Sequence, residues 1–145
     1  MRGILLSLMA IAFVLALFGC SSRKEIECEV FKIKDFDSKI ATKAKDNVDY
    51  ILIESHEEYF ELLSDNKIVL NNPGRFDEEF FEKNMLIFIE FRYSIGVIDL
   101  QATTYLEKKN LVINLHPTFD FGQYFSGQRI GIILEKIDFK DIIIE

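Results

Sequence analysis

Residues 85–91 read Met-Leu-Ile-Phe-Ile-Glu-Phe (MLIFIEF), and this nearly all-apolar stretch decides the fold class. A continuous apolar run of strand length is typical of a central strand that is buried on both faces of a sheet. Helix signals come before the stretch, and strands with alternating apolar and polar residues come after it. The stretch therefore predicts the centre of a sheet to which the flanking segments contribute.

Two short helices are expected between residues 55 and 84. Ser55 and Glu58 form a capping box, in which the serine hydroxyl accepts from the amide three residues on and the glutamate reaches back. An apolar stripe at helical spacing starts at Tyr59. Asp77 is a second N-cap residue, and the acidic residues of 78–83 would occupy the first turn, where the helix dipole favours them.

The rest of the chain predicts strands separated by turns. The order of elements predicts an α+β fold, a mostly antiparallel β-sheet of about six or seven strands with two short helices on one side. Whether the last strand pairs within the domain or leaves an edge open is not decided by the sequence. The other expected strands are 25–34 with a bulge after Val30, 48–54, 97–106, 111–116, 129–137 and 141–145, with loops at 37–46 and 117–127.

The amino-terminal segment resembles an export signal. Ile4 to Phe18 is apolar apart from Ser7, and Met1-Arg2 supplies a positive charge before it. Fifteen helical residues would span about 22 Å, less than the roughly 30 Å of a bilayer core. The segment is therefore interpreted as a signal-peptide core, and the alternative is an uncleaved anchor helix.

The end of this segment, Leu17-Phe18-Gly19-Cys20, resembles the lipobox of bacterial lipoprotein precursors. The resemblance implies cleavage before Cys20, a diacylglyceryl group on its thiol and acylation, for example by palmitate, of the new amino terminus. Two or three acyl chains make a stable membrane anchor, whereas one chain does not. Phe18 departs from the pattern because it is bulkier than the residue usual there.

These features divide the chain into a signal peptide at 1–19, a lipidated tether at 20–25 and a single α+β globular domain at 26–145. The expected location is the extracytoplasmic side of a bacterial envelope membrane. Ser21 after the cysteine resembles lipoproteins that are sent to an outer membrane.

Composition and motifs argue against several functions. The chain has 145 residues with 17 basic and 24 acidic side chains, a net charge of −7, so nucleic-acid binding is not expected. Cys28 alternates with glutamates and should behave as a small core residue, the alternative being a reactive thiol. His56 and His116 lack the spacing of a zinc site. No catalytic residue, metal or cofactor is predicted.

Three stretches resemble the PrcB-like domain, a family named for a lipoprotein that stabilises a secreted protease complex. They are SHEEYFELL at 55–63, FDEEFFEKNMLIFIEF at 76–91 and LVINL at 111–115, within a similarity over roughly 50–137. The resemblance implies a non-catalytic envelope domain that contacts another protein. The turn at 92–96 contains one glycine, whereas family members carry a Ser/Gly-rich turn there.

A protein-binding surface is predicted from the aromatic segment 116–129 and the turn at 92–96. Aromatic and arginine side chains are enriched at interface hot spots. The alternative is that the rings close one end of the core. The leading prediction is a lipid-anchored module that docks on an exported partner such as a protease complex. The alternatives are a small envelope hydrolase that uses a serine, His116 and a carboxylate, and a ligand-binding or structural lipoprotein. The candidate partner-binding residues are Phe119, Phe121, Tyr124, Phe125, Arg129, Arg92 and Tyr93.

Overall fold

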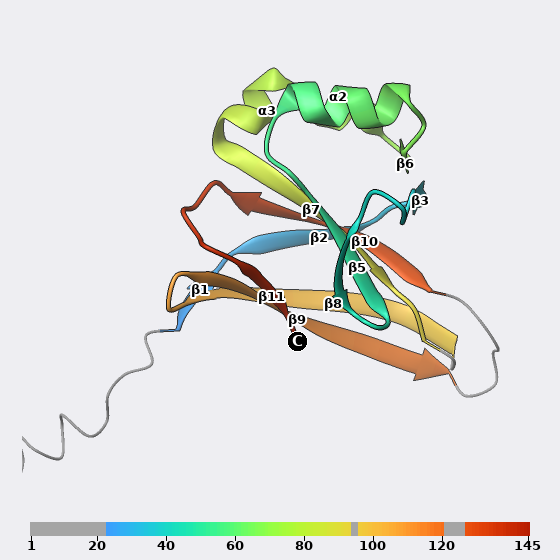
Figure 1. Ribbon diagram of the computed structural model, residues 1–145, viewed down its shortest axis with the longest axis vertical. Coiled ribbons are helices and arrows are strands. Elements are labelled where there is room, and N and C mark those ends of the chain that lie inside the picture. Colours follow the sequence, from blue (N-terminus) through green and yellow to red (C-terminus); the bar gives the residue numbers. More distant parts are fainter. Residues whose placement is uncertain (1–22, 94–95, 121–126) are drawn as a thin grey trace, which may run out of the picture.

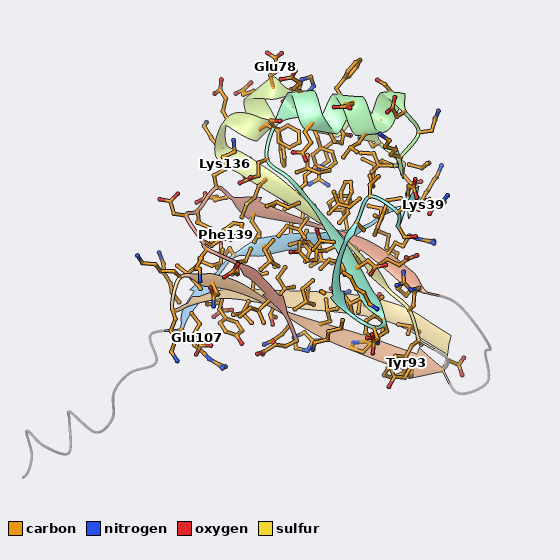
Figure 2. All side chains as sticks on the ribbon, in the orientation of Figure 1. Lys39, Glu78, Tyr93, Glu107, Lys136 and Phe139 are labelled. Carbon is orange, nitrogen blue, oxygen red and sulfur yellow. The ribbon has the colours of Figure 1, made fainter. Side chains whose placement is uncertain are left out.

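Two β-sheets pack face to face, and two helices cover the outer side of one of them (Figure 1). The computed structural model describes residues 23–93, 96–120 and 127–145. The expected signal peptide, Cys20 and the candidate residues Phe121, Tyr124 and Phe125 lie outside these residues. Side chains fill the space between the layers (Figure 2).

The larger sheet has five antiparallel strands with the predicted central strand in the middle. Every residue from Met85 to Phe91 is buried, because this sheet is covered by the second sheet on one face and by the helices on the other. In spatial order the strands are β2 (Cys28–Lys32), β10 (Gln128–Glu135), β7 (Asn84–Phe91), β5 (Val48–Ile53) and β4 (Thr42–Lys45).

The second sheet is built on a long hairpin. The hairpin strands are flanked by a short strand on each side, one of them at the carboxyl terminus. That last strand pairs in parallel with β9, so it belongs to the domain. In spatial order the strands are β1 (Lys24–Ile26), β8 (Gly96–Glu107), β9 (Asn110–Asp120) and β11 (Ile142–Ile144).

Both helices begin at the predicted caps. Ser55 Oγ accepts a hydrogen bond from the Glu58 amide at 3.2 Å, and Asp77 Oδ1 accepts one from Phe80 at 2.9 Å. Glu58 Oε2 reaches back to the amide of Glu54, one residue earlier than in the usual capping box, at 3.2 Å. The elements of this layer are α2 (His56–Ser64), the 3-10 turn η1 (Pro73–Arg75), α3 (Glu78–Lys83) and a ribbon of β3 (Asp35–Phe36) with β6 (Ile68–Val69).

Alternation along β7 creates two cores. Ile87 and Ile89 point into the space between the sheets, while Leu86 and Phe88 point to the helices. Successive side chains of a strand point to opposite faces, so one apolar run serves both layers. This explains why the central strand shows no polar alternation in the sequence.

The α+β class, the mostly antiparallel pairing and the two helices on one side are confirmed. The single sheet of six or seven strands is wrong, because the chain leaves one sheet at Glu27 and enters the other. The predicted strand 25–34 is therefore two strands. Its first part begins at Lys24, inside the range expected to be tether.

Two predicted loops contain strands. Residues 37–46 include β4, and the range 117–127 begins inside β9, which runs to Asp120. The lysines and alanine of β4 have low strand propensity, so this edge strand forms through its pairing with β5.

Candidate partner-binding end of the sandwich

At one end of the sandwich, the starts of β5, β8 and β10 meet the ends of β7 and β9. Gln128 and Val48 both pair with Phe91, and Gly96 pairs with Asp120. On the helix-facing side of the larger sheet, Glu90 continues the row begun by Leu86 and Phe88, because alternate residues of a strand share a face. Arg92, just after the end of β7, contacts Glu90. The row therefore changes from apolar to charged at this end.

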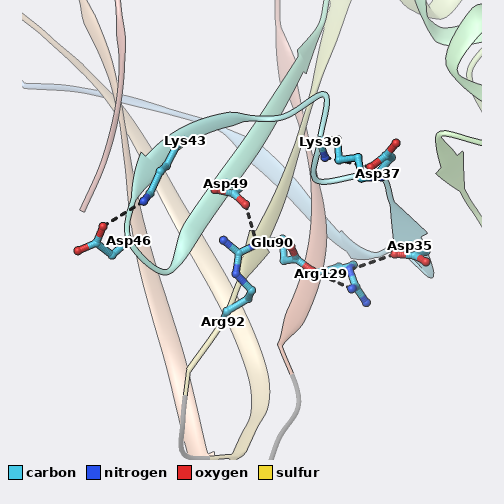
Figure 3. Close-up of polar contacts among 9 residues, drawn as sticks. All are labelled: Asp35, Asp37, Lys39, Lys43, Asp46, Asp49, Glu90, Arg92 and Arg129. Carbon is cyan, nitrogen blue, oxygen red and sulfur yellow. Dashed lines mark hydrogen bonds and ion pairs between the residues drawn. The ribbon is translucent and has the colours of Figure 1, made fainter.

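Three adjacent strands place charged residues side by side here (Figure 3). Asp49 of β5 pairs in register with Glu90 of β7, and Glu90 pairs with Arg129 of β10. Glu90 and Asp49 are only 5% and 7% exposed. A buried carboxylate is costly unless it is paired, so these residues require cationic partners.

Glu90 bridges two arginines. Arg92 Nη1 lies 2.5 Å from Glu90 Oε2 and 2.6 Å from Asp49 Oδ2. Arg129 Nη2 lies 2.7 Å from Glu90 Oε1. The hydrogen bond to Asp49 is the main cause that raises the pKa of Arg92, and the bond to Glu90 adds to it. The two guanidinium groups are held in place by charge-assisted hydrogen bonds.

A third carboxylate completes the cluster. Asp35 Oδ1 lies 3.3 Å from Arg129 Nε, which is buried and makes no hydrogen bond within the described residues. The contact between Asp35 and Arg129 is therefore an ion pair with poor hydrogen-bond alignment. The side chains of Arg92 and Arg129 remain 42% and 33% exposed, so each arginine is held by at least one buried carboxylate while part of it stays in contact with solvent.

Three aromatic side chains, Phe91, Tyr93 and Phe119, pack together at the same end of the sandwich. Tyr93 stacks on Phe91 with ring centroids 5.7 Å apart and an interplanar angle of 7°, and its ring lies 5.3 Å from that of Phe119. Phe91 and Phe119 pack on the core between the sheets, whereas Tyr93 is 47% exposed. Phe119 therefore packs on the core, as the alternative for the aromatic segment expects, whereas Tyr93 is partly exposed.

Of the seven candidate partner-binding residues, the structure brings Arg92, Tyr93, Phe119 and Arg129 to the same end of the sandwich. Sequence reasoning missed Asp49 and Glu90. A usable signal was present, since Glu90 is the one charged residue in MLIFIEF. A carboxylate in a strand buried on both faces must be paired by neighbouring strands.

His56, His116 and Cys28 lie elsewhere. His116 is exposed, and its Nε2 lies 2.9 Å from Thr103 Oγ1. His56 Nδ1 lies 3.9 Å from Glu78 Oε1. Cys28 packs against the core between the sheets, as predicted, with its Sγ 3.8 Å from the carbonyl oxygen of Ala102. Within the described residues, no group of three or more His, Cys, Asp and Glu side chains is placed to hold a metal ion.

Comparison with protein-family models, with curated proteins and with solved structures finds no match to this chain. In the ranges 23–93, 96–120 and 127–145, no helix has the length and apolar character needed to cross a membrane.

Proposed function

We propose that this chain is a lipid-anchored protein of a bacterial cell envelope, a non-catalytic module that docks on an exported protein. The docking surface, called here the docking end, comprises Arg92, Tyr93, Phe119 and Arg129. The observation that carries the proposal is that residues 92 and 93, together with Phe119 and Arg129 from a distant part of the chain, supply arginine and aromatic side chains to one end of the fold. These residue types dominate the energy of protein interfaces.

The guanidinium groups of Arg92 and Arg129 are already ordered before a partner binds. Ordering a long side chain on association costs free energy, and Glu90 already fixes both guanidinium groups. Within the described residues, Arg92 makes its ion pairs through Nη1, so its Nε and Nη2 can donate to carbonyl oxygens of a partner. Tyr93 follows Arg92 in the chain and is 47% exposed, so its ring can contact an apolar side chain of a partner.

The position of the expected anchor supports this arrangement. Lys24 pairs with Leu106 beside the β8–β9 turn, whereas Gly96 and Asp120 form the other end of the same hairpin. The ten residue steps of β8 between these ends correspond to roughly 30 Å. Figure 2 accordingly has Glu107 and Tyr93 at opposite sides of the molecule. An anchor at Cys20 would hold the domain by the end remote from the docking end.

The identity of the partner rests on the sequence resemblance. The PrcB-like stretches suggest that the partner is a component of an exported protease complex. The Arg92–Gly96 turn is where the chain departs from that family, and it borders the docking end. Partner choice is therefore proposed to depend on Arg92 and Tyr93 more than on features shared with the family.

The anchor is tested by metabolic labelling with a palmitate analogue. Wild-type protein should carry the label, and Cys20→Ser should lose it together with membrane retention. Cys28 is the internal control, because it packs against the core and is not expected to take up the label. Label that persists in Cys20→Ser would contradict the anchor.

Docking is tested by cross-linked affinity capture from native envelopes. Tyr93→Ala should reduce recovery of the partner by about tenfold or more, the effect of an interface hot spot. Phe60→Ala is a matched control, since Phe60 is an exposed aromatic residue of the helix layer. Equal recovery with both variants would contradict the proposed surface.

A further inference from the structure

The turn between β8 and β9 holds two lysines in an unusual conformation. Lys108 and Lys109 have φ angles of 50° and 67°, in the left-handed region that non-glycine residues rarely adopt. Two-residue hairpin turns of this type strongly favour Asn-Gly. A lysine pair at such a position is a local outlier of the backbone.

Two further lysines lie beside this turn. The amide of Lys140 donates to the carbonyl of Lys109 at 2.7 Å, and the Lys140 side chain is 80% exposed. Lys24 pairs with Leu106, two residues before the turn. Figure 1 shows the same grouping, with the start of β1 next to the β8–β9 turn. Lys24, Lys108, Lys109 and Lys140 are called here the lysine tip.

The acidic residues around the tip are partly neutralised. Glu107 is paired with Arg23, whose Nε lies 3.1 Å from Glu107 Oε1 and whose guanidinium lies over the Tyr105 ring at 4.7 Å. Asp141 lies 3.6 Å from the Lys140 ammonium. The segments 23–25, 107–110 and 140–141 together hold five basic and three acidic residues, and Glu145, which accepts from the Tyr105 hydroxyl at 3.1 Å and interacts electrostatically with Arg23, adds a fourth acidic residue. The tip is therefore locally positive in a chain of net charge −7.

The helix layer has the opposite character. Residues 54–65 and 77–83 hold nine acidic side chains and a single lysine. Figure 1 places the helices on the outer side of the larger sheet, away from the sheet that carries the tip. A charge distribution of this kind orients the molecule in the field of a charged surface.

We propose that the lysine tip binds the anionic phospholipid surface of the membrane that anchors the chain, with the helix layer held away from it. The proposal rests in part on the lipid anchor proposed above, because Cys20 is three residues before Arg23 and so within about 11 Å of it. At that range the tip lies close to the headgroups, where the attraction of an anionic leaflet is only partly screened. Each lysine at an anionic surface strengthens association about fivefold.

The test is a lysine-acetylation footprint of the full chain, lipidated in a host that processes lipoproteins and reconstituted into nanodiscs. Discs of phosphatidylcholine alone are compared with discs in which part of the lipid is phosphatidylglycerol, whose anionic headgroups supply a negative surface potential. The four tip lysines should react at least about threefold more slowly in the anionic discs, and the protection should disappear at high salt. The internal controls are Lys34 and Lys45, exposed lysines for which the described residues provide no ion pair.

Charge-reversal variants sharpen the test. Lys108→Glu/Lys109→Glu should abolish the protection of Lys24 and Lys140, whereas Lys34→Glu/Lys45→Glu, with the same change in net charge, should leave it intact. Equal acetylation rates of the tip lysines in neutral and anionic discs would overturn the proposal. This holds if the tip is free in both discs and also if an acidic protein occupies it in both.

Failure of the anchor is distinguished by flotation. Retention on neutral vesicles depends on the acyl chains alone, whereas the difference between neutral and anionic lipid depends on the tip. A chain that does not float with neutral vesicles would refute the anchor, and co-flotation with anionic vesicles accompanied by tip protection would still support the tip. Absence of both would overturn both proposals.

Discussion

Replacing Glu90 by Gln should lower the free energy of unfolding by about 3 kcal/mol. The carboxylate is 5% exposed and accepts from Arg92 at 2.5 Å and from Arg129 at 2.7 Å. Hydrogen bonds to a charged group each contribute about 1.5–3 kcal/mol. A glutamine oxygen can keep one of these bonds in weaker form, while its amide group would face the other guanidinium without an acceptor. Asp49 and Asp35 still pair with the arginines, which keeps the loss at the lower end of the range for a broken buried ion pair.

Urea unfolding at neutral pH measures this loss through the shift of the midpoint at an unchanged slope. Glu29→Gln is the matched control, because Glu29 also accepts from an arginine, with Arg75 Nη2 at 2.6 and 2.7 Å, but its side chain is 55% exposed. An exposed pair of this kind contributes at most about 1 kcal/mol. Equal costs for Glu90→Gln and Glu29→Gln would refute the argument that burial makes the Glu90 cluster a fixed platform for the docking end.

Three further changes test the packing, a buried hydroxyl and a helix cap. Gly131→Ala should cost about 1–3 kcal/mol in urea unfolding, because its new methyl group would overlap the ring of Phe31. Gly74→Ala meets nothing within 4 Å and should be neutral or slightly stabilising. Burial raises the pKa of Tyr59 from 10.0 to about 12, and its hydroxyl donates to Pro73 O at 2.7 Å. A group whose pKa is raised by folding stabilises the folded state fully below its unfolded pKa, and this stabilisation is lost as the pH rises above that value. Between about pH 8 and 11 the free energy of unfolding of the wild type should therefore fall by about 1.4 kcal/mol relative to that of Tyr59→Phe. A difference between the two proteins that does not change with pH would contradict the raised pKa of Tyr59. Ser55→Ala should cost about 1 kcal/mol through loss of the cap on Glu58, and no change in the midpoint would count against it.

Local signals in the sequence predict elements whose determinants are also local. The caps at Ser55 and Asp77 are short-range hydrogen bonds, and both helices begin where they indicate. The central strand is apolar because it is buried on both faces, and MLIFIEF is sufficient to find it. Alternation does not encode which sheet a strand joins, so the change of sheet at Glu27 was missed. β4 has weak strand propensity of its own and depends on β5 as a partner.

The candidate site likewise has a part that local sequence predicts and a part that depends on long-range strand pairing. Residue type alone singles out Arg92, Tyr93, Phe119 and Arg129, since arginine and aromatic residues stand out in short segments. The carboxylates that hold the arginines come from register, because Asp49 meets Glu90 and Glu90 meets Arg129 only after three strands have paired. Such pairings join residues far apart in the chain, and no spacing rule identifies them.

Photo-crosslinking tests the docking end most directly. A benzophenone amino acid incorporated at position 93 samples the docking end, and the same amino acid at position 60 samples the exposed helix layer. The cross-linking is done in native envelopes, with the chain produced at its natural level. The account predicts one discrete exported protein cross-linked at position 93 and absent at position 60. The same pattern at both positions, or no adduct at position 93, would contradict it.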